Sequence, residues 1–243
     1  MIAPPYTVPR RGQTRLLLLS GLAAVILWLG WQVLTWPDVA ALEEERPETT
    51  AFIERYRGRG WFGNRREVEW KWVPYRRISS NLKRAVIVSE DIEFFSHDGF
   101  SRRETRAALE DAWEEKKLPR GASTITQQLA KNLWLSPSRN PVRKVKEAIL
   151  TRQLEEHLSK RRILEIYLNV VELGPGIYGA EAATRHYFGK SAASLTTRQA
   201  AELAAVLPRP KSWHPGSKSK SYQSKVRSIQ RRMAKASWLR RSL

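Results

Sequence analysis

The stretch from Pro141 to Gly174, PVRKVKEAILTRQLEEHLSKRRILEIYLNVVELG, decides the fold class. Apolar residues recur at three- and four-residue spacing over 142–158 and again over 161–170, which predicts two consecutive helices. Ser159 stands between them at a position suited to an N-cap. Gly174 begins a Gly-Pro-Gly sequence that breaks the helical pattern. This part of the chain is therefore expected to be α-helical.

The same spacing continues on both sides of this stretch. Further helices are predicted over 81–90, 103–117, 124–133, 180–187 and 197–206. Residues 61–77 mix aromatic and basic side chains and predict an extended segment or short hairpin, with Pro74 arguing against a central strand. Three prolines after residue 207 are expected to close the last well-packed region, and a basic stretch then leads into a final helix. We expect one mainly α-helical domain at 61–235 and a basic tail at 236–243.

An apolar segment near the N-terminus predicts a membrane anchor. No charged residue lies between Arg15 and Asp38, and the 19 residues from Leu16 to Leu34 would form a helix of about 28 Å, close to a bilayer core. Arginines precede the segment and acids follow it, so the positive-inside rule places the tail 1–15 in the cytoplasm and the rest outside. A cleavable signal peptide is the alternative. We favour an uncleaved transmembrane anchor at 16–36, because the apolar run exceeds a signal core of about 7 to 15 residues.

Composition limits the partners and the chemistry. The net charge is +19, and +16 remains beyond the anchor. Such a charge first suggests a nucleic-acid partner, but an exported, tethered chain favours anionic lipid headgroups or phosphate-bearing and acidic substrates. The chain has no cysteine, so it has no disulfide and no thiol nucleophile. The polar, Arg/Glu-rich residues 37–60 are expected to form a stalk with one short helix.

The segment EDIEFFSHDG, Glu90 to Gly99, is the first candidate for chemistry. A carboxylate that follows an apolar helix and precedes aromatic residues is expected to be partly desolvated, which suits a general base. His97 and Gly99 would shape the loop that orients it. Exposed acids at a helix end are an equally good interpretation of this segment alone.

The second candidate is RGASTITQQLAKN, Arg120 to Asn132. Ser123 is suited to cap a helix on which Thr124, Gln128 and Lys131 share one face. Hydroxyl, amide and ammonium groups at a helix N-terminus favour a sugar phosphate or diphosphate. A solvated helix face is the alternative, although solubility alone does not require two adjacent glutamines at this place.

Other patterns give less evidence for a functional site when each is taken alone. Arg143 and Glu147, four residues apart, are by themselves a surface ion pair, and Tyr167, Leu168 and Asn169 are interpreted as core and helix end. The four histidines lack zinc-ligand spacing. The chain also lacks a Gly-rich phosphate loop and a GxSxG elbow.

Taken together and in order, the segments resemble the peptidoglycan glycosyltransferases, specifically the monofunctional biosynthetic transglycosylases, from about Val73 to Met233. The motifs are EDxxFxxHxG at 90–99, GxSTITQQxxKN at 121–132, RKxxE at 143–147, RRILEIYLN at 161–169 and GPGIYGAEAATRHYFGK at 174–190. Each motif is moderately specific, whereas the ordered set is very specific. The resemblance implies a lysozyme-like helical domain with a small membrane-facing subdomain, preceded here by the transmembrane helix.

The resemblance also implies a reaction and the residues that perform it. The enzyme would polymerise lipid II at the outer, periplasmic face of the inner membrane, with Glu90 as general base and Glu147 as second essential carboxylate. Glu90 would deprotonate the 4-hydroxyl of the acceptor GlcNAc as it attacks C1 of the donor MurNAc, expelling undecaprenyl diphosphate with inversion. The implied substrate-binding residues are Thr124, Gln128, Lys131, Asn132, Arg143 and Lys144.

The resemblance further implies which cofactors and partners to expect. Glu147 would organise the diphosphate-binding cations or a Mg²⁺ or other divalent ion, and no organic cofactor is expected. Lipid II, the growing lipid-linked glycan, the membrane and unidentified cell-wall synthesis proteins are the expected partners, with no nucleic acid. Since the chain ends near the end of the glycosyltransferase motifs, we expect no transpeptidase activity. A glycan hydrolase and a non-catalytic membrane scaffold are the alternative functions.

Two positions depart from the family pattern. Ser101 stands where many relatives have Asp, which puts a local hydrogen bond in doubt. Ala122 replaces a glycine, so position 122 must avoid a conformation that only glycine adopts. Of the two adjacent acids, Glu90 is the predicted base, and Asp91 is predicted to be a turn or cap acid.

Overall fold

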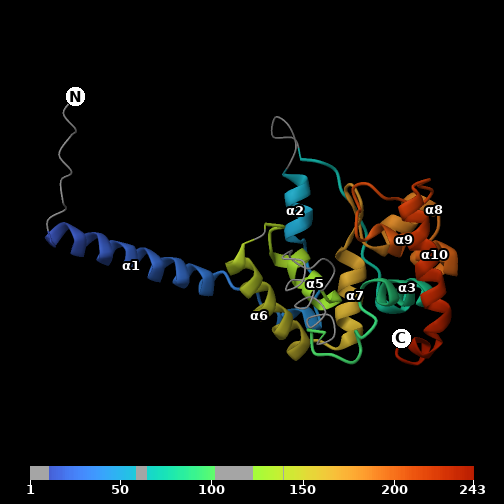
Figure 1. The fold of residues 1–243 in the computed structure, drawn as a ribbon, viewed down its shortest axis with the longest axis horizontal. Coiled ribbons are helices and arrows are strands. Elements are labelled where there is room, and N and C mark those ends of the chain that lie inside the picture. The colour runs from blue at the N-terminus through green and yellow to red at the C-terminus, as the bar shows by residue number, and fades with distance from the viewer. Residues whose placement is uncertain (1–10, 59–64, 102–122, 139) are drawn as a thin grey trace, which may run out of the picture. The chain divides into compact units, whose positions relative to one another are not determined.

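The computed structural model describes residues 11–58, 65–101, 123–138 and 140–243, and the fold is mainly helical, as predicted (Figure 1). It divides into a first unit, Met1–Asp38, and a compact second unit, Val39–Leu243. The first unit contains helix α1 (Arg11–Leu34). The helix predicted over 103–117 lies outside the described residues.

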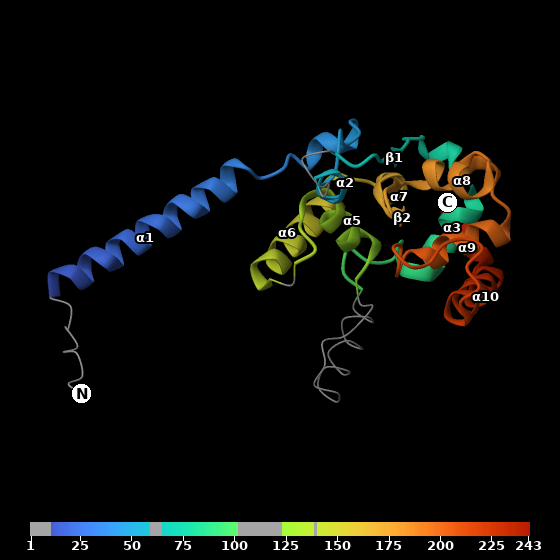
Figure 2. The ribbon, with the colours of Figure 1, turned by 90° about the horizontal axis from the view of Figure 1, so that it is seen from above.

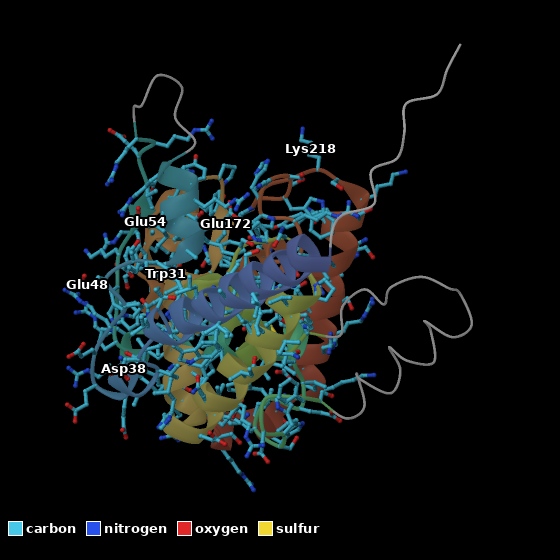
Figure 3. All side chains as sticks on the ribbon, turned by 90° about the vertical axis from the view of Figure 1, so that its left-hand side faces the viewer. Trp31, Asp38, Glu48, Glu54, Glu172 and Lys218 are labelled. Atoms are coloured by element: carbon cyan, nitrogen blue, oxygen red, sulfur yellow. The ribbon has the colours of Figure 1, made fainter. Side chains whose placement is uncertain are left out.

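The predicted transmembrane anchor is not confirmed. Among the helices of the described residues, none combines the length and the apolar character that a membrane span requires. Helix α1 does cover most of the segment 16–36. Its described side chains include several large apolar ones that are exposed, namely Leu19, Leu22, Ile26, Leu27, Trp28, Trp31 and Leu34. Trp31 is labelled in Figure 3.

The second unit contains helices and three short strands. Its first half comprises η1 (Ala40–Glu43), α2 (Ala51–Arg57), β1 (Glu69–Trp70), η3 (Tyr75–Arg77), α3 (Ser80–Glu90), α5 (Ile125–Trp134) and α6 (Pro141–His157). Its second half comprises α7 (Lys160–Val170), β2 (Glu172–Gly174), β3 (Ile177–Tyr178), α8 (Ala180–Phe188), η4 (Ala192–Ser194), α9 (Thr197–Val206), α10 (Lys220–Lys235) and η5 (Ser237–Arg241). The strand order is β1-β3-β2, with β1 parallel and β2 antiparallel to β3.

The helices pack in two groups. Helix α9 packs against both α3 and α10, whereas α5 packs against α6 and α7. Figures 1 and 2 both place α6 and α10 at opposite ends of the second unit. Helix α3 is buried from Leu82 to Val88, so its C-terminal residue Glu90 is held by a helix with little freedom to move.

Side-chain caps explain why most helices begin close to the predicted residues. Ser159 caps α7 by accepting a hydrogen bond from the amide of Arg162 (3.2 Å), as predicted. Thr196 caps α9 in a reciprocal capping box with Gln199. The prediction that Ser123 caps α5 is wrong, because Thr124 is the N-cap residue.

Most of the residues expected to form a stalk belong to the second unit and pack against the rest of it. Val39, Leu42 and Ile53 are buried, and α2 contacts α5 while η1 contacts α6. The guanidinium of Arg162 donates to the carbonyls of Leu42 (2.8 Å) and Glu45 (2.6 Å), which ties this segment to α7. Isolated apolar side chains in a polar stretch are a weak sequence signal, but here Val39, Leu42 and Ile53 enter the core.

The C-terminal end is also better packed than expected. Helix α10 buries Tyr222, Val226, Ile229 and Met233, although the prolines before it were expected to close the packed region. Within the expected basic tail, Leu239 is fully buried in η5. Of the extended segment predicted over 61–77, residues 61–64 lie outside the described residues. Within 65–77 the prediction is confirmed at β1, which pairs with β3 and not in a hairpin.

Candidate active site

Three predicted segments meet where α3 ends. One carboxylate oxygen of Asp91 accepts a hydrogen bond from the amide of Ile125 at the start of α5 (3.0 Å). The loop that follows reaches α6 at Gly99, where φ is +87° and an added Cβ would lie 2.8 Å from Cγ2 of Thr151. The carbonyl of Gly99 accepts a hydrogen bond from the hydroxyl of Thr124 (2.7 Å). The Glu90 loop is thus fixed to both α5 and α6.

Glu90 is half-buried and receives two hydrogen bonds. The hydroxyl of Ser89 donates to its Oε1 (2.8 Å), and the amide nitrogen of Gln128 donates to its Oε2 (3.3 Å). Both donors are neutral, so they orient the carboxylate without an ion pair. An ionised, oriented carboxylate is what a general base requires. Glu90 therefore has the geometry of the predicted role.

Tyr167 is a residue that sequence reasoning missed. Its hydroxyl donates to Oε1 of Gln128 (2.9 Å), so the amide nitrogen of Gln128 must face Glu90 and the carbonyl of Ser123 (3.2 Å). Burial, and then the negative charges of Glu90 and Asp91, raise the pKa of Tyr167 well above its usual value. The hydroxyl therefore remains a donor. The only sequence signal was a tyrosine at a buried helix position where a phenylalanine would pack equally well.

Asp91 is a structural acid, as predicted. It is 1% exposed, and both of its carboxylate oxygens lie 3.0 Å from Nε2 of His97. Since Nδ1 of His97 accepts from the amide of Gly99 (3.1 Å), the ring carries a proton on Nε2, which it donates to Asp91. Ser101, which stands where many relatives have Asp, also forms a local hydrogen bond: its hydroxyl donates to the carboxylate of Glu93 (2.9 Å).

The first predicted substrate ligand, Thr124, has a structural task. It is 1% exposed, accepts a hydrogen bond from the amide of Gln127 (3.2 Å) and donates to the Gly99 carbonyl. The side chain of Gln127 completes the capping box by accepting from the Thr124 amide (3.0 Å). Asn132 is also buried, at 7% exposed, near the other end of α5. Of the predicted ligands on α5, Gln128 and Lys131 are the half-buried ones.

Glu147 forms a compact charge cluster on α6. Its side chain is 4% exposed; Nη1 of Arg143 lies 2.5 Å from Oε2, and Nζ of Lys144 bonds to Oε1. Because the Glu147 carboxylate is buried, the interpretation as a surface ion pair, which the segment alone suggested, is wrong, although the Lys144 side chain is 53% exposed. Nε of Arg143 is buried without a hydrogen-bond partner in the described residues. The guanidinium therefore retains a donor that no described group satisfies.

The ammonium group of Lys131 interacts electrostatically with both Glu147 and Glu90. Burial is the main cause that lowers the pKa of Lys131, and the charges of Arg143 and Lys144 lower it further. Glu147 and Glu90 both act in the opposite direction, so Lys131 lies within electrostatic range of both carboxylates. Three cations around one carboxylate leave a local charge of about +2, which favours a dianionic group such as a diphosphate.

The described residues do not fit the predicted divalent-metal site. They contain no group of three or more His, Cys, Asp or Glu side chains able to hold a metal ion together. Both oxygens of Glu147 are engaged by cationic side chains, which compete with a metal for the same lone pairs. The metal requirement stays a prediction, and no step below passes through a metal.

Comparison with known proteins identifies the family of the chain. The transglycosylase family model matches residues 59–234. A biosynthetic peptidoglycan transglycosylase of Thiobacillus denitrificans is 48% identical over 85% of this chain and 87% of its own length. Relatives of the same name from Methylobacillus flagellatus and Paraburkholderia xenovorans are each 44% identical, and cover 89% and 94% of this chain and 93% and 96% of their own lengths. The chain therefore belongs to the transglycosylase family.

Proposed function

We propose that the protein polymerises lipid II into the linear glycan strands of peptidoglycan. The relatives named above are biosynthetic peptidoglycan transglycosylases. The observation that carries the proposal is the pairing of an oriented carboxylate, Glu90, with a separate cationic cluster at Lys131, Arg143 and Lys144. A glycosyl transfer from a diphosphate needs both a base for the acceptor and cations for the leaving group.

In the proposed reaction Glu90 takes the proton of the acceptor's GlcNAc 4-hydroxyl. The oxygen forms a bond to C1 of the donor's MurNAc, the bond from C1 to the diphosphate oxygen breaks, and the configuration at C1 inverts. Negative charge then grows on the departing undecaprenyl diphosphate. Lys131, Arg143 and Lys144 stabilise that charge more in the transition state than in the ground state, because the charge is larger there. Glu147 keeps two of these cations in place.

We further propose that the protein works at the outer face of the inner membrane, with the N-terminus in the cytoplasm and residues 16–36 attaching it. The exposed apolar side chains of α1 support this. A second apolar surface is present on α6, where Val142, Val145 and Ile149 are exposed at i, i+3 and i+7. Exposed apolar groups next to the cation cluster suit a substrate whose diphosphate carries a lipid tail.

Incubating the purified full-length protein with lipid II, with and without Mg²⁺, tests the proposal. Glycan polymer on a gel is the expected product. Release of soluble fragments from purified sacculi without activity on lipid II would identify a hydrolase that uses water as nucleophile, and would overturn the proposal.

A further inference from the structure

The C-terminal part of the chain carries a charged surface that the proposed reaction does not use. After Glu202 the sequence contains eleven Lys and Arg residues and no acidic residue. Besides Arg232, six of their exposed side chains belong to α10 and η5: Lys220, Arg227, Arg231, Lys235, Arg240 and Arg241. We call these six residues the C-terminal basic face. Lys218, just before α10, is also exposed and is labelled in Figure 3.

Packing keeps these charges on the outer side of α10. The buried residues of the helix follow one another at i, i+4, i+7 and i+11, and they face α3 and α9. Lys220, Arg227, Arg231 and Lys235 recur at i, i+7, i+11 and i+15, which places them on the opposite side. They form a line of about 22 Å along the helix, at about 1.5 Å per residue.

The described residues do not neutralise this face. None of its six cations forms an ion pair with a described acid, whereas Arg198 on α9 pairs with Glu202 (3.0 Å). Beneath the face, Arg84 on α3 is 6% exposed, and its Nε has no hydrogen-bond partner among the residues that the structure describes. Burial lowers the pKa of Arg84, and the nearby charge of Arg240 lowers it further. Positive charge therefore accumulates here at an energetic cost, which an external anion would relieve.

The position of the face favours an anion in the aqueous space over a bilayer. Helix α10 lies at the opposite end of the second unit from α6, whose exposed apolar side chains are proposed to contact lipid (Figures 1 and 2). The apolar side of α10 is buried against the core, so the helix cannot insert it between lipids. A line of cations on a rigid helix suits a linear polymer that bears repeated negative groups.

We propose that the C-terminal basic face binds carboxylates on the peptides of the glycan strand that the enzyme makes. This rests on the proposed function, which supplies a polymer whose attached peptides each end in a carboxylate. Many weak contacts along one strand raise its effective concentration near the active site, so the strand stays bound between additions. The face thereby lengthens the product without taking part in the transfer reaction.

A matched pair of full-length variants tests the proposal. Arg227→Glu with Arg231→Glu reverses two charges of the face, and Arg76→Glu with Arg77→Glu makes the same charge change at exposed positions of η3. We expect the first variant to bind purified sacculi about tenfold more weakly than wild type in about 50 mM salt. The difference in affinity between the two proteins should be smaller in about 300 mM salt, because salt screens the charges. The control variant should bind like wild type.

Two further measurements distinguish the partners. On lipid II, the α10 variant should keep the wild-type initial rate and make shorter strands, and strands of unchanged length would contradict the proposal. Weaker binding to vesicles of anionic phospholipid with unchanged binding to sacculi would assign the face to lipid headgroups and overturn it. Binding to sacculi needs no polymerisation. If the protein were inactive on lipid II, the proposed function would be refuted, but the comparison of sacculus binding would still test the role of the basic face.

Discussion

At the scale of single residues, Glu90 and Glu147 differ in their neighbours, which suits the two carboxylates to different roles in the proposed reaction. Glu90 receives hydrogen bonds from a serine and a glutamine, and no ion pair engages it in the described residues. Glu147 is engaged by two cations and almost fully buried. A carboxylate that must accept a proton is better served by neutral donors, because a direct cation would make it a weaker base. These surroundings suit Glu90 to the role of base in the proposed reaction, and Glu147 to holding the cations.

Tyr167 should matter for activity although it lies behind Gln128. Tyr167→Phe removes the donor that fixes the amide of Gln128, so the amide can turn its oxygen toward Glu90 and misplace the base. We expect kcat on lipid II to fall about tenfold, since small displacements of a catalytic group are costly.

The matched control is Tyr222→Phe. It also removes a buried hydroxyl, one that donates to the carbonyl of Glu202 (2.9 Å), far along the chain from the base. Each variant should lose about 1 kcal/mol of unfolding free energy. Equal losses of activity in the two variants would mean that Tyr167 acts only through stability.

At the scale of elements, α3 carries a buried lysine, Lys83, whose burial lowers the unfolding free energy by an amount that should depend on pH. Burial first, and Arg161 second, lower the pKa of Lys83 from 10.5 to about 8, with Glu165 acting in the opposite direction. Its ammonium lies 3.5 Å from the centroid of the Tyr75 ring, which offsets part of the cost. Below pH 8 both the folded and unfolded states hold the proton, so the full cost of the buried charge is present there.

As the pH rises from about 8 to about 10, the folded state loses this proton while the unfolded state keeps it. The unfolding free energy of wild type should therefore rise by about 2 kcal/mol relative to Lys83→Met over that range. The variant should be the more stable protein at pH 7. Denaturant unfolding of both proteins at pH 7 and pH 10 measures the difference, and a constant difference would contradict the lowered pKa.

Local sequence signals predicted where helices begin better than they predicted which distant residues the helices contact. Ser159 caps a helix at the expected place, and Thr196 caps the helix that was predicted to begin at residue 197, because a cap acts within one turn. The hydrogen bond from the amide of Ile125 to Asp91 joins residues 34 positions apart, and no local pattern announces it. The packing of Leu42 depends in the same way on Arg162, 120 residues later. The site residues were predicted through ordered motifs, whereas Tyr167 needed the folded structure.

At the scale of the whole molecule, the boundary at Asp38 makes the membrane role testable. Val39–Leu243 is a compact unit with its own core, so deletion of residues 1–36 should leave a folded domain. We expect the truncated protein to polymerise lipid II in detergent at the wild-type rate and more slowly on liposomes, because attachment confines enzyme and substrate to one plane. Equal rates of the two proteins on liposomes would show that the segment does not serve this purpose.

The central claim is that Glu90 is the base of a lipid II polymerase, and one comparison tests it most directly. Wild type, Glu90→Gln and Asp98→Asn, which alters an exposed carboxylate in the same loop, are assayed with lipid II and unfolded in parallel. The amide cannot accept the proton, so Glu90→Gln should polymerise at least about 100-fold more slowly at wild-type stability, with Asp98→Asn near the wild-type rate. Polymer made by Glu90→Gln at the wild-type rate would contradict the claim.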